Sequence, residues 1–323
     1  MPTLPVPTSR AVVACSPRTA PIIIAGSTFA NNTATAEGGG ISIDNFGEVT
    51  LSESTIRDNR AGEDGGGIEN SGTRVTFTEL LIIGNWAGVD GGGIHNSSSG
   101  EFQILDTTIQ QNSAINGGGV GNAPDNAIIV RRSLVVGNVA RNPGLNDDGT
   151  PADGGLGGGF YSLADGDSLI ENSTLSANTA AVAGGGLFHD ADGELKLVQL
   201  TIWRNSAPQG GGIGVAESDF VPTNPPSANS SVIARNIIVG GSTQGGSCDY
   251  YITSEGGNID TGGTQVVDPA AANGLPTATA CFLSAPPNTD SGPQAGRDHF
   301  IPAYAIDAIA NNGGLNLTHA IGD

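Results

Sequence analysis

The chain has 323 residues, enough for one large or two average domains. Glycine accounts for 51 of them, about twice the usual share, whereas aromatic residues make up only 5%. This composition disfavours an ordinary globular α/β enzyme. The formal net charge of −20 repels phosphate backbones and anionic membrane surfaces. We therefore expect no nucleic-acid binding, and no transmembrane segment either, because no run of about 18 apolar residues exists.

Residues 1–21 predict an extended N-terminal arm, because Pro2, Pro5 and Pro7 prevent a helix there. Residues 12–15 (Val-Val-Ala-Cys) would pass as a bacterial lipoprotein cleavage box. The apolar stretch Ala11–Ala14 is too short for a secretory leader, which needs about 7–15 apolar residues. We expect that a leader has been lost or truncated, and lipidation is the weaker interpretation.

A repeat of 26 or 27 residues organises residues 22–240. Three glycines followed by an apolar residue recur seven times, with spacings of 27, 26, 26, 40, 27 and 26 residues. The spacing of 40 is one unit with an insertion at residues 141–156. We expect this insertion to leave the stack sideways, so that Val120 still lies under Phe160. The triplets begin at Gly38, Gly65, Gly91, Gly117, Gly157, Gly184 and Gly210.

A second landmark keeps the same step along the chain. An apolar residue precedes an asparagine by three positions in eight places, at Asn32, Asn59, Asn85, Asn112, Asn138, Asn178, Asn205 and, after a longer gap, Asn236. Between these landmarks apolar and polar residues alternate, as in Val49–Leu51 and Leu195–Leu197. A period of two is typical of short strands, and no stretch has helical spacing over three turns.

Three short strands in each unit predict an all-β fold, a right-handed single-stranded parallel β-helix (β-solenoid) of about eight turns with a C-terminal cap. In this fold each strand pairs with its equivalent one turn later, and like residues stack about 4.8 Å apart. Glycine triplets then supply the positive φ of sharp corners, and the asparagines form a hydrogen-bonded ladder at a bend. An inward column of small residues is expected at Ser27, Ser54, Thr107, Ser133, Ser173 and Ser231.

Residues 241–323 break the period and are predicted to form an irregular cap region. A cap is needed because the open end of a solenoid exposes unpaired strand edges. Cys248 and Cys281 both lie in this region, whereas Cys15 is alone in the arm. In an oxidising compartment we expect a disulfide between Cys248 and Cys281, and two buried thiols are the alternative.

The landmarks at residues 54–59 (Ser-Thr-Ile-Arg-Asp-Asn) and 65–68 (Gly-Gly-Gly-Ile) resemble the repeats of bacterial polymorphic outer-membrane proteins and related right-handed parallel β-helix surface proteins. The resemblance covers about residues 22–240. The C-terminal part, including residues 257–260 (Gly-Asn-Ile-Asp) and 311–320, is similar to the terminal region of surface β-helix proteins with a choice-of-anchor domain. The resemblance implies a bacterial protein that is exported and lies outside the cell or on its surface.

Acidic residues in register suggest a cation site. In three successive turns an aspartate follows the third glycine of the triplet by six residues, at Asp125, Asp165 and Asp192. In the last two of these turns a second acid follows it by eight residues, at Asp167 and Glu194. Stacked carboxylates repel one another unless they are solvated or bridged, and oxygen-only ligands suit Ca²⁺. A Ca²⁺ site and a solvated acidic edge are both open interpretations. They are equally open for a second column, which comprises Glu37, Asp64, Asp90 and then Asn116.

The sequence assigns no catalytic and no cofactor-binding residue. Lys196, the only lysine, follows Asp192 by four residues, and nothing singles out the pair of acids that glycoside hydrolysis requires. The four histidines are scattered, with His95 and His189 on the strands that follow the glycines but three turns apart. Catalysis is therefore not expected.

A further interpretation is that a flat row of stacked, outward side chains binds a ligand. An outward threonine column comprises Thr28, Thr55, Thr108, Thr174 and Thr201, with Leu81 and Leu134 as interruptions. Trp86 and Trp203, which we expect to be exposed, are suited to stacking on sugars, although lone aromatic residues more often pack at corners.

Taken together, the sequence predicts a secreted or cell-surface protein with a structural or adhesive role. Self-assembly into extracellular fibres through head-to-tail contacts is one form of that role, and surface glycans are the other expected partner class. The alternative function is that of a polysaccharide-binding or polysaccharide-cleaving β-helix, similar to a lyase or hydrolase.

Overall fold

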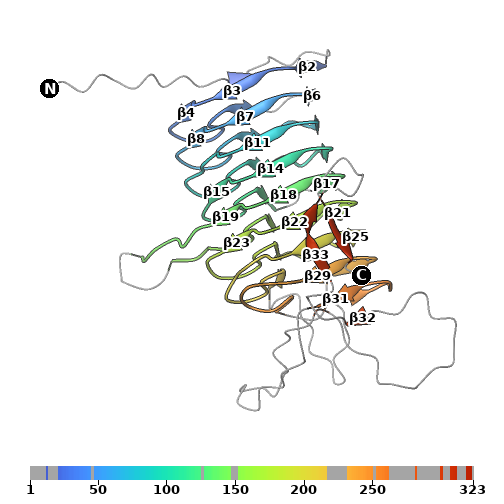
Figure 1. Ribbon diagram of the computed structural model, residues 1–323. Coiled ribbons are helices and arrows are strands. Elements are labelled where there is room, and N and C mark those ends of the chain that lie inside the picture. Colours follow the sequence, from blue (N-terminus) through green and yellow to red (C-terminus); the bar gives the residue numbers. More distant parts are fainter. Residues whose placement is uncertain are drawn as a thin grey trace.

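The structure is a computed structural model of the chain. It describes residues 12–13, 21–44, 47–124, 127–146, 152–216, 231–249, 252–261, 281, 299–300, 306–310 and 318–321. These residues form an all-β parallel solenoid in which successive turns stack along one axis (Figure 1). The predicted fold class is confirmed. No helix within the described ranges has the length and apolarity needed to cross a membrane.

Each turn contributes one strand to each of three parallel sheets, named here A, B and C. Sheet A contains β1 (Val12–Val13), β5 (Ile41–Ile43), β9 (Ile68–Asn70), β12 (Ile94–Asn96), β16 (Val120–Asn122), β20 (Phe160–Ser162), β24 (Leu187–His189) and β27 (Ile213–Val215). Sheet B contains β2 (Ile22–Ala25), β6 (Glu48–Ser52), β10 (Arg74–Thr78), β13 (Glu101–Leu105), β17 (Ile128–Arg131), β21 (Ser168–Glu171), β25 (Leu195–Val198), β28 (Val232–Arg235) and β30 (Thr253–Ser254).

Sheet C contains β3 (Thr28–Ala30), β7 (Thr55–Arg57), β11 (Leu81–Ile83), β14 (Thr108–Gln110), β18 (Leu134–Val136), β22 (Thr174–Ser176), β26 (Thr201–Trp203), β29 (Ile238–Gly240), β31 (Ile259–Asp260) and β32 (His299–Phe300). Shorter parallel strands flank sheet C, namely β4 (Thr33–Ala34), β8 (Arg60–Ala61), β15 (Ser113–Ala114), β19 (Val139–Ala140) and β23 (Thr179–Ala180). An antiparallel pair is formed by β33 (Ile306–Ala310) and β34 (Thr318–Ile321).

Alternation along the strands builds the core. Val75 and Phe77 of β10 point inward and are fully buried, and Thr76 between them faces out. Val75 pairs in register with Val49 of the turn before and with Phe102 of the turn after. Equivalent apolar residues therefore stack in columns through the tube, as the period of two predicts.

Counted from sheet B, seven turns between β2 and β27 carry a strand of all three sheets, slightly fewer than the eight expected. The eighth turn contributes β28 and β29, but its place in sheet A is taken by Cys248, which forms only an isolated bridge with Ile213. The two-residue strands β30 and β31 extend sheets B and C by a further partial turn.

The glycine triplets have two separate functions. The first glycine of each triplet has φ between 51° and 66°, a left-handed corner that glycine favours. The second packs against the next turn, because a Cβ on Gly66 would lie 2.5 Å from the Trp86 carbonyl oxygen. Both the conformation and the close approach of backbones therefore require glycine.

The asparagines form the predicted ladder along the bend after sheet C. The Nδ2 of Asn85 donates to Oδ1 of Asn112 (2.9 Å) and to the carbonyl oxygen of Ile56 (3.0 Å). Its Oδ1 accepts from both the backbone N–H and Nδ2 of Asn59, each at 3.0 Å. The same side-chain bond joins Asn32, Asn59, Asn85, Asn112, Asn138, Asn178 and Asn205 in succession. Each interior amide is thus satisfied by its two neighbours.

The eighth predicted ladder residue, Asn236, was assigned to the wrong position. Ile233 pairs with Lys196 in sheet B, so Asn236 lies at the bend between sheets B and C with φ 54°. Val239 pairs with Ile202 in sheet C. Here the same pattern, an apolar residue three positions before an asparagine, falls at the end of a strand of sheet B instead of sheet C.

The small-residue column is confirmed for its buried hydroxyls and wrong at Ser231. The hydroxyls of Ser54, Thr107, Ser133 and Ser173 each accept a backbone N–H from the turn before. In the eighth turn the equivalent residue is Ile237, whose N–H donates to Oδ1 of Asn258 instead.

The insertion leaves the stack intact, as expected. Val120 pairs directly with Phe160, although the insertion separates these two residues in sequence. Arg141 N–H donates to the Ala114 carbonyl oxygen at 2.7 Å, and Leu156 N–H donates to Oδ1 of Asn116 at 3.2 Å. Both ends of the insertion are therefore fixed to the preceding turn.

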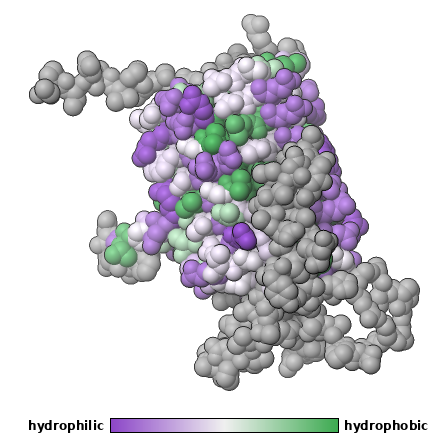
Figure 2. Space-filling model, viewed as in Figure 1, coloured by the Kyte–Doolittle hydropathy of each residue, from purple (hydrophilic) through white to green (hydrophobic). Residues whose placement is uncertain are grey.

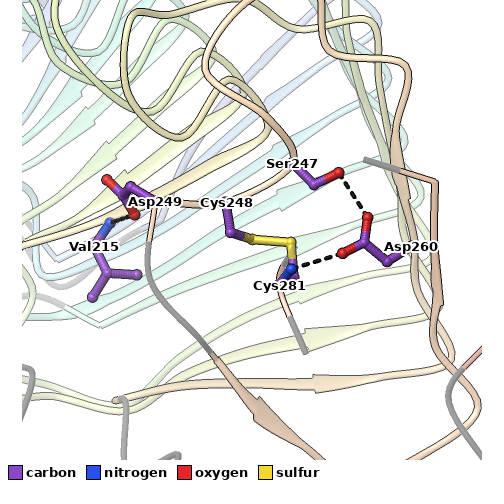
Figure 3. The surroundings of a disulfide bond; sticks show 6 residues. All are labelled: Val215, Ser247, Cys248, Asp249, Asp260 and Cys281. Carbon is purple, nitrogen blue, oxygen red and sulfur yellow. Dashed lines mark hydrogen bonds between the residues drawn. A yellow bond between two sulfur atoms is a disulfide. The ribbon is translucent and has the colours of Figure 1, made fainter. Parts of the chain in front are cut away.

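A disulfide joins Cys248 to Cys281, which confirms the expected pairing (Figure 3). Both cysteines are fully buried in the core cluster. The Asp260 carboxylate accepts from the Cys281 N–H and from the Ser247 hydroxyl, each at 2.7 Å. The bridge and these bonds cover the apolar core beyond the seventh turn.

Removing one asparagine from the middle of the ladder should destabilise the whole stack. In Asn112→Ala, the N–H and side-chain amide of Asn85 lose their acceptor, and each unsatisfied buried group costs about 1–3 kcal/mol. We expect a loss of about 3 kcal/mol or more, measured by urea denaturation. The control is Gln110→Ala, two residues away on the outer surface, and an equal loss in both variants would contradict the role of the ladder.

Reducing the disulfide should loosen only the C-terminal end of the solenoid. The two cysteines are 33 residues apart, and closing such a loop contributes about 3–4 kcal/mol in the chain-entropy description. Turns contact only their neighbours, so we expect faster amide hydrogen exchange in β28–β31 and no change in β10. Cys248→Ser should behave like the reduced protein. Uniform loss of protection along the stack would contradict this prediction.

Candidate functional site

The middle residue of each sheet A strand forms an outer lane across the solenoid. The flanking residues, such as Ile41 and Ile43, point into the core, so the middle side chain points the other way. The corner at the first glycine of each triplet covers it, because a Cβ on Gly91 would lie 2.7 Å from the Cβ of His95. In chain order the lane comprises Ser42, Glu69, His95, Gly121, Tyr161, Phe188 and Gly214.

A buried ion pair lies in this lane between adjacent strands. The His95 Nδ1 is 2.8 Å from Oε2 of Glu69, and the two side chains are 9% and 3% exposed. The other carboxylate oxygen, Oε1, accepts from the Ser97 hydroxyl at 2.6 Å. Both oxygens of Glu69 are therefore engaged. The next residue of the lane is Gly121, where a Cβ would lie only 3.2 Å from Cδ2 of His95. The absence of a side chain there leaves room for the His95 ring.

The charges of three further carboxylates act on the pair, and we call Glu37, Asp64, Glu69 and Asp90 the acidic cluster. Burial alone would lower the pKa of His95, but the hydrogen bond and charge of Glu69, together with Asp64 and Asp90, raise it to about 9. His95 is therefore positively charged at neutral pH and offsets part of the repulsion within the cluster.

Like charges and burial raise the pKa values of two acids of the cluster, Glu37 and Asp90. Burial raises the pKa of Glu37, and the charges of Glu69 and Asp64 raise it further. Burial also raises the pKa of Asp90, against the opposing effects of its bond with Asn116 and the charge of His95. The second acidic column of the sequence is thus a real cluster, and asparagine in place of an acid in its fourth turn limits the repulsion.

Hydrogen bonds between successive turns hold this column together. Oδ1 of Asp64 accepts from the Asp90 N–H at 2.8 Å, and Oδ1 of Asp90 accepts from Nδ2 of Asn116 at 3.0 Å. With one oxygen each of Asp64 and Asp90 hydrogen-bonded, and with His95 protonated, these side chains form a charged structural network at a corner of the solenoid. Its chemistry favours structural charge pairing over proton transfer to a substrate.

Three of the predicted Ca²⁺ carboxylates lie on the surface. Asp165, Asp167 and Asp192 are exposed, and Glu194 pairs with Lys196 at 2.5 Å. Asp125 lies outside the described residues. Within the described ranges, no group of three or more His, Cys, Asp or Glu side chains is arranged to hold a metal ion. Because Asp125 belongs to the predicted set, the Ca²⁺ site stays a prediction.

Sequence reasoning found the acidic column but missed the pair beside it. Glu69 and His95 each follow the third glycine of their triplet by two residues, so register alone places them on adjacent rungs. His189 differs from His95, because it is the third residue of its strand and is fully buried. Burial lowers the pKa of His189, whose Nε2 lies 3.0 Å from the Gly193 carbonyl oxygen.

A second feature lies on sheet C. The outward residues of its first five strands, here called the neutral face, are Thr28, Ala30, Thr55, Arg57, Leu81, Ile83, Thr108, Gln110, Leu134 and Val136. Arg57 is the only charged residue among them. Figure 2 shows apolar and weakly polar residues over the middle of this side and hydrophilic residues towards its margins. Leu81 is 36% exposed.

The two tryptophans differ from each other. Trp203 is only 2% exposed, so the expectation that it is available for sugar stacking was wrong. It faces outward from β26 but packs against Gly241, where a Cβ would lie 2.8 Å from its ring. Trp86, at the bend after sheet C, is half-buried.

Comparison with known proteins gives one match. The family described as the Chlamydia polymorphic membrane protein (Chlamydia_PMP) repeat matches residues 26–44, which run from Gly26 through β3, β4 and β5. No curated protein and no solved structure matches the chain significantly. The matched segment contains one asparagine and one glycine landmark, and the solenoid repeats both. The resemblance of the repeats to those of polymorphic membrane proteins is confirmed, and it points to a bacterial outer-membrane or surface protein.

The Glu69–His95 pair should make stability depend on pH. Since the pKa of His95 is about 9 in the folded chain and ordinarily 6.5, the folded state binds this proton more tightly. Its contribution is fully present below pH 6.5 and is lost as the pH rises through 9. We expect the urea midpoint to fall across this range, and to fall less in His95→Gln, which should be less stable at pH 6.5. Parallel pH profiles for the two proteins would contradict this assignment.

Proposed function

We propose that the chain is a cell-surface β-helix with a structural and adhesive role, and that the neutral face is its contact surface. The main support for this proposal is the difference in charge between the neutral face and the chain as a whole. The protein has a net charge of −20, yet the outward residues of β3, β7, β11, β14 and β18 contain no carboxylate.

The physical argument concerns repulsion and area. Biological surfaces are mostly anionic, and a face with carboxylates would be repelled by them over about 10 Å at 0.1 M ionic strength. The neutral face avoids this cost and offers the apolar side chains of Leu81 and Ile83 for burial against a partner. Because the strands stack in register, these side chains are held rigidly, and binding does not have to order them.

Export fits the remaining features of the chain. The repeat match points to a surface location, and a buried disulfide is typical of oxidising, extracytoplasmic compartments. We therefore propose that the protein acts outside the cell, where a high negative charge keeps it soluble.

Fibre formation stays a proposal within this role. Val12 and Val13 pair with Ser42 and Ile43 of the same chain, so this part of the arm returns to its own first turn in sheet A. In sheets B and C the first strands in order are β2 and β3. A head-to-tail contact between copies would therefore form by strand addition at these two edges.

The alternative, a polysaccharide-cleaving β-helix, has less support. In the acidic cluster both oxygens of Glu69 are hydrogen-bonded and His95 is protonated at neutral pH, so neither is poised as a base. Glycan binding without cleavage remains compatible with the adhesive role.

Adding negative charge to the neutral face should abolish adhesion. We expect Leu81→Glu with Ile83→Glu to reduce the binding of chain-coated beads to cell layers by about ten-fold or more, equivalent to ~1.4 kcal/mol. The matched control is Thr50→Glu with Thr76→Glu, which adds the same charge on the outer side of sheet B. Circular dichroism checks that both variants fold. Equal effects of the two pairs, or none, would overturn the assignment of this face.

A further inference from the structure

Two arginines stack on one tryptophan at the bend between sheet C and the short strands. Arg60, Trp86 and Ser113 occupy the same outward position in three successive turns, as their backbone bridges show. The guanidinium carbon of Arg60 lies 3.4 Å from the centroid of the Trp86 ring. That of Arg141, from the start of the insertion two turns further on, lies 4.6 Å from the same ring.

Arg141 is held firmly in this position. Its backbone N–H donates to the Ala114 carbonyl oxygen, and its Nη2 donates to the carbonyl oxygen of Ala87 at 2.5 Å. Its Nε is buried and has no hydrogen-bond partner within the described residues. Burial, followed by the charge of Arg60, lowers the pKa of Arg141. The site therefore holds two mutually repelling cations and a donor without an acceptor.

Two cations lie together here without an ion pair. Five other described Lys and Arg side chains, at Arg57, Arg74, Arg131, Arg132 and Lys196, form ion pairs with nearby carboxylates. Arg60 and Arg141 form none within the described part of the chain, and nor do Arg204 and Arg235, but Arg60 and Arg141 also contact one common ring. In a protein with 32 acidic residues and only 12 Lys and Arg, two cations left together without a carboxylate leave room for an anion from outside.

We propose that Arg60, Trp86 and Arg141 form a binding site for the carboxylate of an acidic sugar. Guanidinium groups recognise planar carboxylates through paired hydrogen bonds, and stacking on an aromatic ring orients them for it. The Trp86 ring holds the two guanidinium groups together, and Ser113 lies one rung away.

The net charge defines the kind of glycan. A protein with a net charge of −20 repels long polyanions, so nucleic acids and densely charged polysaccharides are disfavoured as ligands at low ionic strength. A short oligosaccharide with a few carboxylates carries little of that penalty and keeps the local attraction to the two arginines. This site is separate from the neutral face and goes beyond the adhesive role proposed for it, so either assignment can fail without the other.

The test compares an acidic sugar with its neutral counterpart. The full-length chain is titrated with trigalacturonate and with the fully methyl-esterified trisaccharide, by calorimetry and by tryptophan fluorescence. We expect saturable binding of the acid, with a fluorescence change that is lost in Trp86→Phe, and no binding of the ester. Equal binding of acid and ester, no binding of either, or an equal response to acetate at the same concentration would overturn the proposal.

Matched variants locate the site. Arg60→Gln and Arg141→Gln should each weaken binding of the acid at least ten-fold, and the double variant should abolish it. Arg74→Gln on sheet B removes the same charge elsewhere and should leave affinity within two-fold. Arg60→Lys and Arg141→Lys keep the charge without the planar fork, and should bind more weakly than the wild type if folding tolerates them. Unchanged affinity in the folded double variant would overturn the assignment of these residues.

Discussion

Hydrogen bonding between the buried asparagines is the constraint on which the rest of the molecule depends. Each interior amide uses its donors and its acceptor on the turns directly above and below. A change in the spacing of two turns would leave several buried polar groups unpaired at once, at about 1–3 kcal/mol each. The apolar columns, the hydroxyl column and the glycine corners must therefore all keep one common spacing. The ladder converts a repeat in sequence into a fixed repeat in space.

Fixed spacing makes neighbours of side chains that would otherwise avoid one another. Along the acidic column the repulsion is limited by substitution, since asparagine replaces the acid at position 116, and by the charge of His95 opposite Glu69. Around Trp86 no such compensation exists within the described residues, because Arg60 and Arg141 both contact the ring and neither forms an ion pair. Surface chemistry on this scaffold is thus specified by register. A functional site is therefore expected where a residue differs in chemistry from the equivalent residues of the other turns.

Much of this architecture could be predicted from the sequence, because glycine triplets and asparagines report directly on corners and bends. Glu69 and His95 share a register position that the sequence contains, but register alone does not show that the glycine corner buries this outward position. Asn236 was misplaced because a longer segment before β28 shifts the frame, and the same short pattern then falls in sheet B. The contact of Arg141 with Trp86 could not be predicted from register, since Arg141 reaches across two turns from the insertion. Contacts along a column follow from counting residues, whereas contacts between columns depend on side-chain reach.

The undisturbed pairing of Val120 with Phe160 across the insertion has a consequence for how such a chain can change during evolution. Each unit presents the same hydrogen-bonding edges to both neighbours, so a gene segment that encodes one whole unit can be duplicated or lost by unequal recombination. The products would differ in rod length but not in cross-section. Extra sequence can also enter at a corner without disturbing the rungs on either side. The length of the rod and the loops on its surface can therefore vary independently in proteins built from such repeats.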